Sequence, residues 1–122
     1  MKIMVVDDEQ DIESLFTQKF RKELRKGDIE IEFAFSGEDA LEKWEKEGSS
    51  NVVLILSDIN MPGMNGLELL KKLKQEFPQQ KVYMITAYED KENYQKAMEY
   101  GADDFINKPI DFETLKKKIF DI

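Results

Sequence analysis

The feature that most constrains the fold of this chain is a strict alternation of strand-like and helix-like segments. Five short segments are apolar, or alternate between apolar and polar residues, and each is followed by apolar residues at helical spacing. The expected strands are 2–7, 29–35, 52–57, 81–86 and 104–108, and the expected helices lie within 10–26, 36–48, 65–77, 94–101 and 111–119. Such alternation implies an α/β fold, with a parallel sheet covered by helices on both faces.

The number of these units decides between two architectures. Right-handed crossovers leave either an open doubly wound sheet or part of a closed barrel, and five units are too few for an eight-stranded barrel. Segment 52–57 is apolar on both faces, as a central parallel strand is, whereas 29–35 is half polar and suits an edge. We therefore predict one domain over residues 1–122, a (βα)5 sheet of flavodoxin-like order 2-1-3-4-5.

The ends of the expected helices follow from residues that cap a helix or stop it. Side chains that can accept hydrogen bonds from a first turn precede three of the helices, and glycines follow three. The expected caps are Ser36 with Asp39, Asn65 with Glu68, and Asp111, and the closing glycines are Gly27, Gly48 and Gly101.

Charge and composition argue against several classes of function. The net charge of −8 would repel nucleic-acid phosphates, so we expect no direct nucleic-acid partner. The longest aliphatic run, Val52–Leu56, is too short to span a bilayer, and the absence of cysteine fits the cytoplasm, so we expect a cytoplasmic protein without a membrane partner. Without histidine, any phosphoryl, proton or metal chemistry must rest on other side chains.

Some of the basic residues fall into short groups, Lys19, Arg21, Lys22, Arg25 and Lys26 in one and Lys116, Lys117 and Lys118 in another. We interpret both groups mainly as solvated helix faces that suit the helix dipole. The alternative interpretation is that one of them helps to dock a protein partner.

The polar residues that follow the expected strands share one edge of the sheet. Asp7 and Asp8 follow the first strand, Asp58 the third and Lys108 the fifth, and Thr86 ends the fourth. Ligands of such sheets bind outside the carboxyl ends of the strands, where the strand order reverses. The three carboxylates should therefore lie close together in one shallow pocket.

Clustered carboxylates and a lysine suggest a particular chemistry. Three carboxylates in one pocket repel, so one would become neutral unless a cation joined them. Oxygen ligands without histidine or cysteine favour a hard ion, and Mg²⁺ fits because it takes one or two carboxylates and keeps several waters. With Lys108 opposite, a phosphoryl group could be held against Asp58 and give an aspartyl phosphate.

Four motifs then occur in order, with spacings that are highly specific together. They are "VVDDE" (5–9), "LSDINMPGMNG" (56–66), "MITAY" (84–88) and "GADDFINKP" (101–109). On these motifs the chain resembles a response-regulator receiver domain of two-component signalling, chemotaxis-regulator-like, over essentially its whole length. The resemblance implies Mg²⁺-dependent phosphorylation of an aspartate as a signal.

Carried over by position, the resemblance implies a role for each charged residue of this edge. Asp58 is the expected phosphoacceptor, and Asp8 is the expected direct metal ligand. Asp7 would act through a metal-bound water, and the backbone carbonyl of Asn60 would complete the metal site. Lys108 is expected to contact the phosphoryl group.

The resemblance also implies a conformational switch. Thr86 is the expected switch hydroxyl, and Phe105 is the expected switch aromatic, with ordinary core packing as its alternative role. The family implies a cis Lys108–Pro109 bond, and Asn60 and Tyr88 occupy positions that tune reaction rates. Phenylalanine stands where tyrosine is also common, so no ring hydroxyl takes part.

The leading hypothesis is therefore a phosphorylation-dependent switch, which catalyses only its own phosphorylation and dephosphorylation. It would receive phosphate from a histidine kinase or histidine phosphotransfer protein, and change the surface of residues 90–121 for an output protein or a fused effector domain. One alternative is a receiver-like docking module that acts without phosphorylation. A free-standing phosphate-monoester hydrolase is the other, but Ile59 and Asn60 offer no general acid or base beside Asp58.

Overall fold

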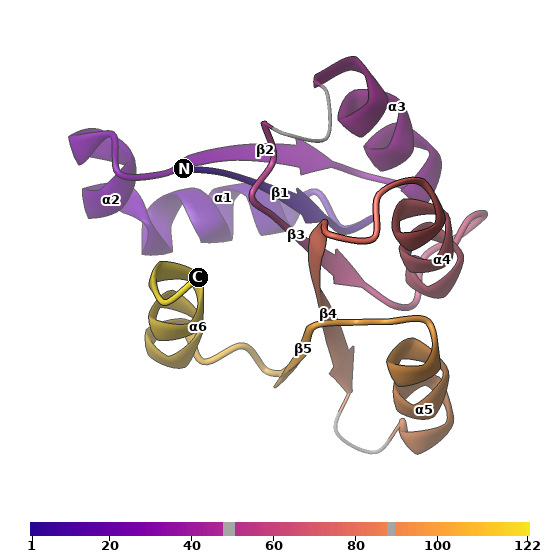
Figure 1. Cartoon of the computed structure of the whole chain (residues 1–122). Coiled ribbons are helices and arrows are strands. Elements are labelled where there is room, and N and C mark those ends of the chain that lie inside the picture. The colour runs from indigo at the N-terminus through magenta and orange to yellow at the C-terminus, as the bar shows by residue number, and fades with distance from the viewer. Residues whose placement is uncertain (48–50, 88–89) are drawn as a thin grey trace.

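The computed structural model describes residues 1–47, 51–87 and 90–122. Its centre is a five-stranded sheet of order β2-β1-β3-β4-β5, in which every neighbouring pair is parallel (Figure 1). The strands are β1 (Lys2–Val6), β2 (Glu30–Ala34), β3 (Leu54–Asp58), β4 (Lys81–Ala87) and β5 (Asp104–Lys108). The expected parallel sheet and its strand order are confirmed.

Helices cover both faces of the sheet (Figure 1). On one face lie α3 (Gly37–Glu47), α4 (Gly66–Glu76) and α5 (Lys91–Glu99), and on the other lie α1 (Asp11–Lys19) and α6 (Phe112–Phe120). Each layer has its own buried cluster, the first around Trp44 and Leu70 and the second around Phe16 and Leu115. Within the described ranges, no helix is both long and apolar enough to cross a membrane.

The burial of the strands matches their place in the sheet. Every residue of β3 is buried, because helices cover both of its faces and strands flank both of its edges. β2 has one free edge, and of its five residues only Ala34 is fully buried. The apolar and the half-polar patterns therefore predicted a central and an edge strand correctly.

The helix ends agree with the expected caps. In three helices, a backbone N–H of the first turn donates a hydrogen bond to the expected capping side chain. The bonds are Asp39 N–H to Ser36 Oγ (3.0 Å), Glu68 N–H to Asn65 Oδ1 (3.0 Å) and Glu113 N–H to Asp111 Oδ1 (3.1 Å). Gly27 and Gly101 have left-handed φ angles of 78° and 95° and follow helix ends as expected. Gly48 lies outside the described residues.

The first helix differs from the expectation, because it is broken at Phe20. α1 ends at Lys19, Phe20 takes φ −102° and ψ 18°, and a separate six-residue helix, α2 (Arg21–Lys26), follows. The Phe20 ring is fully buried and stacks on Phe16 at a centroid distance of 5.8 Å, whereas α2 has no buried residue. The core thus holds the chain at Phe20, and the helix changes direction beyond it.

The start of α4 packs unusually close to the end of β3. Gly66 is buried, and a Cβ atom on it would overlap the backbone carbonyl oxygen of Asp58. The Gly66 N–H donates to the Ile59 carbonyl at 2.8 Å. Only a residue without a side chain fits here, so this glycine fixes the path of the chain immediately after Asp58.

We expect Gly66→Ala to lower the free energy of unfolding by about 1–3 kcal/mol or more, because the overlap is with backbone atoms that cannot rotate away. Gly27→Ala is the matched control: its Cβ would meet nothing within 4 Å, so only its left-handed φ of 78° opposes the change, at a cost of about 1 kcal/mol. Urea unfolding measures both. Equal losses in the two variants would contradict the steric argument.

Candidate functional site

The carboxyl ends of the strands bring the expected site residues to one edge of the sheet. β1 pairs with β3 so that Val6 lies beside Ser57, which places Asp7 and Asp8 next to Asp58. Further along the same edge, at the carboxyl ends of β4 and β5, Ala87 pairs with Lys108. Adjacent parallel strands therefore deliver these residues from four separate parts of the chain.

Three carboxylates form the centre of the site. One carboxylate oxygen each from Asp7, Asp8 and Asp58 lies within 4.8 Å of the others. Asp7 and Asp58 are buried, with 6% and 5% exposure, and Asp8 is exposed. Burial raises the pKa of Asp7, and the charges of Asp58 and Asp8 add to this, against the opposing effects of the Glu9 N–H at 3.0 Å and of Lys108.

Lys108 provides the positive charge of the site. Its ammonium lies 3.0 Å from Asp58 Oδ1, and its side chain is 45% exposed. Partial burial alone would lower the pKa of Lys108, but the hydrogen bond and charge of Asp58, together with Asp7 and Glu9, raise it above the ordinary value. The lysine therefore remains charged beside the carboxylates. The Lys108–Pro109 peptide bond is cis, as expected.

Thr86 lies one residue before the end of β4, and Phe105 lies in the neighbouring strand β5. Thr86 is buried and its hydroxyl donates to the Ala87 carbonyl at 3.3 Å. Phe105 is half-buried, and its ring lies 4.2 Å from the ring of Tyr94 on α5, tilted by 36°. A cavity of about 260 Å³ is lined by Thr86, Ala87 and Tyr94, among others.

The loop after Asp58 carries Asn60, which is exposed. Sequence reasoning missed the contacts that hold this loop. The Met64 N–H donates to the Glu38 carboxylate at 3.3 Å, and a Cβ on Gly37 would lie 2.6 Å from the Met64 carbonyl oxygen. The N-terminus of α3 therefore supports the loop, a contact that only the tertiary structure creates. Tyr88 lies outside the described residues.

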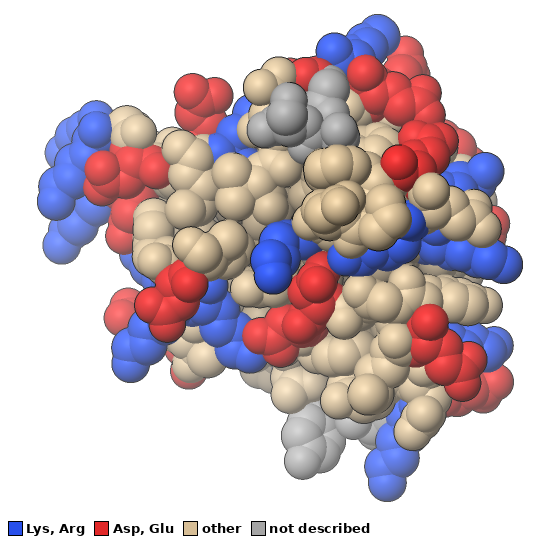
Figure 2. Space-filling view, in the orientation of Figure 1, with Lys and Arg blue, Asp and Glu red and all other residues tan. Residues whose placement is uncertain are grey.

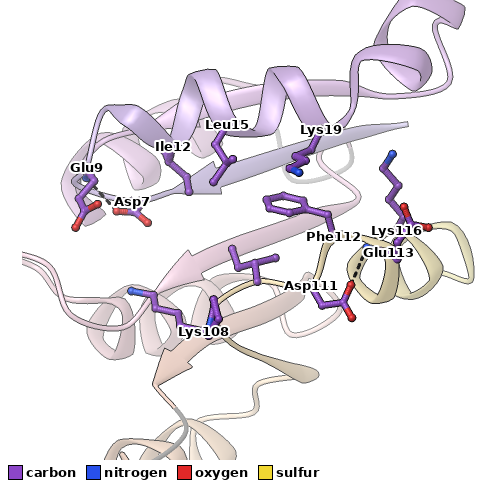
Figure 3. Close-up of a pocket in the computed structure, with 12 residues that line it drawn as sticks. Asp7, Glu9, Ile12, Leu15, Lys19, Lys108, Asp111, Phe112, Glu113 and Lys116 are labelled. Atoms are coloured by element: carbon purple, nitrogen blue, oxygen red, sulfur yellow. Dashed lines mark hydrogen bonds between the residues drawn. The ribbon is translucent and has the colours of Figure 1, made fainter.

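A groove between α1 and α6 leads away from the carboxylates (Figure 3). It measures about 700 Å³, with Asp7 and Lys108 at one end and Lys19 and Lys116 at the other. Leu15, one of the apolar residues at helical spacing within 10–26, lines this groove and is 37% exposed. A sequence pattern of apolar residues does not distinguish a groove wall from the core, so the groove was not predicted.

The chemistry of this arrangement follows from its donor set. Three carboxylates within 4.8 Å of one another offer oxygen ligands to a hard divalent cation, and Mg²⁺ suits a shallow site that leaves room for water. An ammonium 3.0 Å from the buried carboxylate can neutralise a second anion, such as a phosphoryl group, at the same place. The residues present therefore fit both a metal ion and a phosphate.

Asp7→Asn should raise the free energy of unfolding of the metal-free protein at neutral pH. The pKa of Asp7 is higher in the folded protein than in the unfolded chain. The free energy of unfolding of the wild type therefore falls as the pH rises from the unfolded pKa to the folded pKa, because the folded protein resists ionisation of Asp7. The gain from asparagine should therefore be complete above that window and disappear below about pH 3.8, the ordinary Asp value.

Urea unfolding in a chelator, at neutral and at acidic pH, measures this effect. The exposed Asp28→Asn controls for the loss of one negative charge elsewhere on the chain. If Asp7→Asn is less stable than the wild type at neutral pH, the interactions of the Asp7 charge with the Glu9 N–H and Lys108 outweigh its burial and the repulsion from Asp58 and Asp8.

Comparison with known proteins agrees with this geometry. A family model described as response regulator receiver domain matches residues 3–120. The chain is 35% identical over 119 residues to a cyclic di-GMP phosphodiesterase of Thermotoga maritima, covering 98% of this chain and 30% of that protein. It is 33% identical over 118 residues to the response regulator ArlR of Staphylococcus saprophyticus, covering 97% of this chain and 50% of ArlR. The chain thus spans half or less of these relatives.

A solved structure gives the same result. The CheY-like response regulator receiver domain protein from Methanospirillum hungatei matches with a TM-score of 0.85 at 34% identity, covering 98% of this chain and 90% of that one.

The name phosphodiesterase describes the whole Thermotoga protein, and the match with this chain covers only 30% of its length. Receiver domains are regulators rather than enzymes of the ordinary kind. They take phosphate from histidine kinases, bind Mg²⁺ at an acidic pocket and act on output domains. Because the family model covers nearly the whole chain and the fold agrees, this chain belongs to the response regulator receiver domain family.

Proposed function

We propose that this domain is a switch in which Asp58 accepts a phosphoryl group from a histidine kinase or a histidine phosphotransfer protein. One observation carries the proposal: the buried Asp58 carboxylate has oxygens of two other carboxylates within 4.8 Å and an ammonium 3.0 Å away. Repulsion among the acids serves no structural purpose, so it indicates a site built for a cation. The paired lysine indicates that an anion joins the cation there.

In the proposed transfer, an oxygen of Asp58 attacks the phosphorus of the partner's phosphohistidine. The oxygen–phosphorus bond forms while the phosphorus–nitrogen bond breaks, and the bonding pair leaves with the imidazole nitrogen, which takes up a proton. Lys108 keeps a phosphoryl oxygen in place and neutralises its charge.

Asp7, Asp8, Asp58 and the Asn60 carbonyl would hold Mg²⁺, which supplies further positive charge to the phosphoryl oxygens when bound. The buried positions of Asp7 and Asp58 support this assignment, because a buried carboxylate gains most from a cation nearby. Asp8, which is exposed, is the ligand that solvent and an incoming ion reach first.

The proposed signal runs through Thr86 and Phe105. The Thr86 hydroxyl now donates to a neutral carbonyl at 3.3 Å, and a phosphoryl oxygen would be a stronger acceptor. If the Thr86 side chain moved toward the phosphoryl oxygen, it would leave space beside β5, next to the cavity lined by Thr86 and Tyr94. Phe105 could turn into that space and leave Tyr94, which would change the surface of α5, β5 and α6 that an output protein or effector domain reads.

We expect one phosphoryl group to be added to the protein by a small acyl or amido phosphate with Mg²⁺, and none to Asp58→Asn. Intact-mass measurement detects the addition, and Asp28→Asn, exposed and outside the carboxylate group, is the matched control that should still gain it. An unchanged gain in Asp58→Asn would refute the assignment. Repeated turnover of the donor without a stable product would favour a hydrolase, and no reaction would favour a docking module.

Thr86→Ala should still be phosphorylated but should lose the structural response. A hydrogen bond to a charged acceptor contributes about 1.5–3 kcal/mol, comparable to the coupling of about 1–3 kcal/mol usual between allosteric sites. Hydrogen exchange of the amides of α5, β5 and α6, with and without phosphorylation, measures the response, and the exposed Thr17→Ala is the control. If phosphorylated Thr86→Ala retains the full change in protection, the signal does not pass through this hydroxyl.

A further inference from the structure

We propose that α2 is an electrostatic docking site for an acidic segment of a protein partner, separate from the carboxylate site. The segment 19–26 has five basic side chains and one acidic one, in a chain whose net charge is −8. The basic residues are Lys19, Arg21, Lys22, Arg25 and Lys26. Positive charge is therefore concentrated in this segment of an otherwise acidic chain.

The only acid of this segment does not neutralise it. Glu23 pairs with Lys116 of α6 at 3.2 Å, and the two side chains are only 20% and 23% exposed. Among the residues that the structure describes, no ion pair involves any of the five basic side chains of the segment. The Lys19 ammonium lies over the Phe112 ring, 5.9 Å from its centroid, and the four charges of α2 are available to a partner.

These charges are also fully presented to solvent. The four basic residues of α2 are all exposed, and no residue of this helix is buried. In Figure 2, Lys and Arg side chains gather at the left end of the molecule, over the place of α2 in Figure 1. The break at Phe20 produces this arrangement, because it turns α2 away from the direction of α1.

Although Arg25 and Lys26 in the last turn suit the helix dipole, the spacing of the basic residues in α2 also brings like charges together. Arg21 with Arg25, and Lys22 with Lys26, are like-charged pairs one helical turn apart, which destabilise a helix. α2 has six residues and no side-chain cap at its N-terminus. Like-charged pairs that destabilise a helix and that the fold does not require are typical of sites that serve a function.

The occupant that fits best is a carboxylate-rich protein segment. Arginine guanidinium groups bind carboxylates in bidentate pairs, and the two stripes of cations match acids one turn apart on a partner helix. Nucleic acid fits less well, since α2 is only about 9 Å long and the protein as a whole is acidic. A membrane surface fits less well because Leu24, the one apolar residue of α2, is half-buried and cannot insert.

The groove between α1 and α6 relates this site to the carboxylates. Lys19 and Lys116 close the end of the groove that lies toward α2, and Asp7 and Lys108 lie at the other end (Figure 3). A partner that covers the groove could therefore place an acidic segment on α2. This relation rests on the proposed function, but the docking site itself does not require phosphorylation.

The test is a nuclear magnetic resonance titration at low salt with decaglutamate as the probe. The wild type is compared with Arg21→Glu/Lys22→Glu and with Lys72→Glu/Lys81→Glu, which changes the charge equally at exposed positions elsewhere. We expect amide shifts confined to residues 19–26, and affinity about tenfold lower in the α2 variant than in the control. Both charge-reversed variants should still accept phosphate, so this test can fail without affecting the proposed function.

A melting curve checks that the α2 variant is folded. Its glutamates stand one turn before Arg25 and Lys26, so opposite charges replace the repulsive pairs and the melting temperature should equal or exceed that of the wild type. Absence of binding, equal binding by the two variants, or shifts spread over other basic residues would overturn the proposal. So would tighter binding at α2 of decathymidylate or of phosphatidylserine vesicles than of decaglutamate.

Discussion

The pairing of β1 with β3 is the constraint on which the rest of this structure depends. Both strands lie inside the sheet, with helices on both faces, so the buried stretches Ile3–Val6 and Leu54–Ser57 carry no charge. Charged residues can appear only where the strands end, and parallel pairing makes β1 and β3 end side by side. Asp7, Asp8 and Asp58 are therefore neighbours because of the sheet and not because of any attraction among them.

The apolar core supports this unfavourable arrangement. Two buried clusters, one on each face of the sheet, stabilise the fold, while the carboxylates at its edge repel one another. Lys108 offsets part of this repulsion through its contact with Asp58. The positive charges of α2, at the far end of α1, form a second group that opposes folding locally. In both places the chain keeps like charges together where a partner or an ion would make them favourable.

The site is held firmly on one side and loosely on the other. Gly66 fits against the end of β3, and Glu38 accepts from the Met64 N–H, so the loop after Asp58 is fixed by α3 and α4. Near the end of β4, the Thr86 hydroxyl donates to a neutral carbonyl at 3.3 Å, and the half-buried ring of Phe105 contacts the half-exposed Tyr94 beside a cavity. The proposed response to phosphorylation of Asp58 is therefore placed on the α5 side, where the cavity lies, and not on the α3 side.

The sequence by itself determined the elements, their order and the edge of the sheet where chemistry can occur. Periodicity distinguishes the buried β3 from the edge strand β2, and the parallel sheet implied by the alternation of strands and helices brings Asp7, Asp58 and Lys108 to one edge. Only the tertiary structure decided the break at Phe20, because the helical spacing of apolar residues continues through it and the stacking on Phe16 is invisible in a one-dimensional pattern. For the same reason the sequence left open the Glu38 contact, the exposure of Leu15 in the groove and the direction of α2, since each depends on which distant segment packs against it.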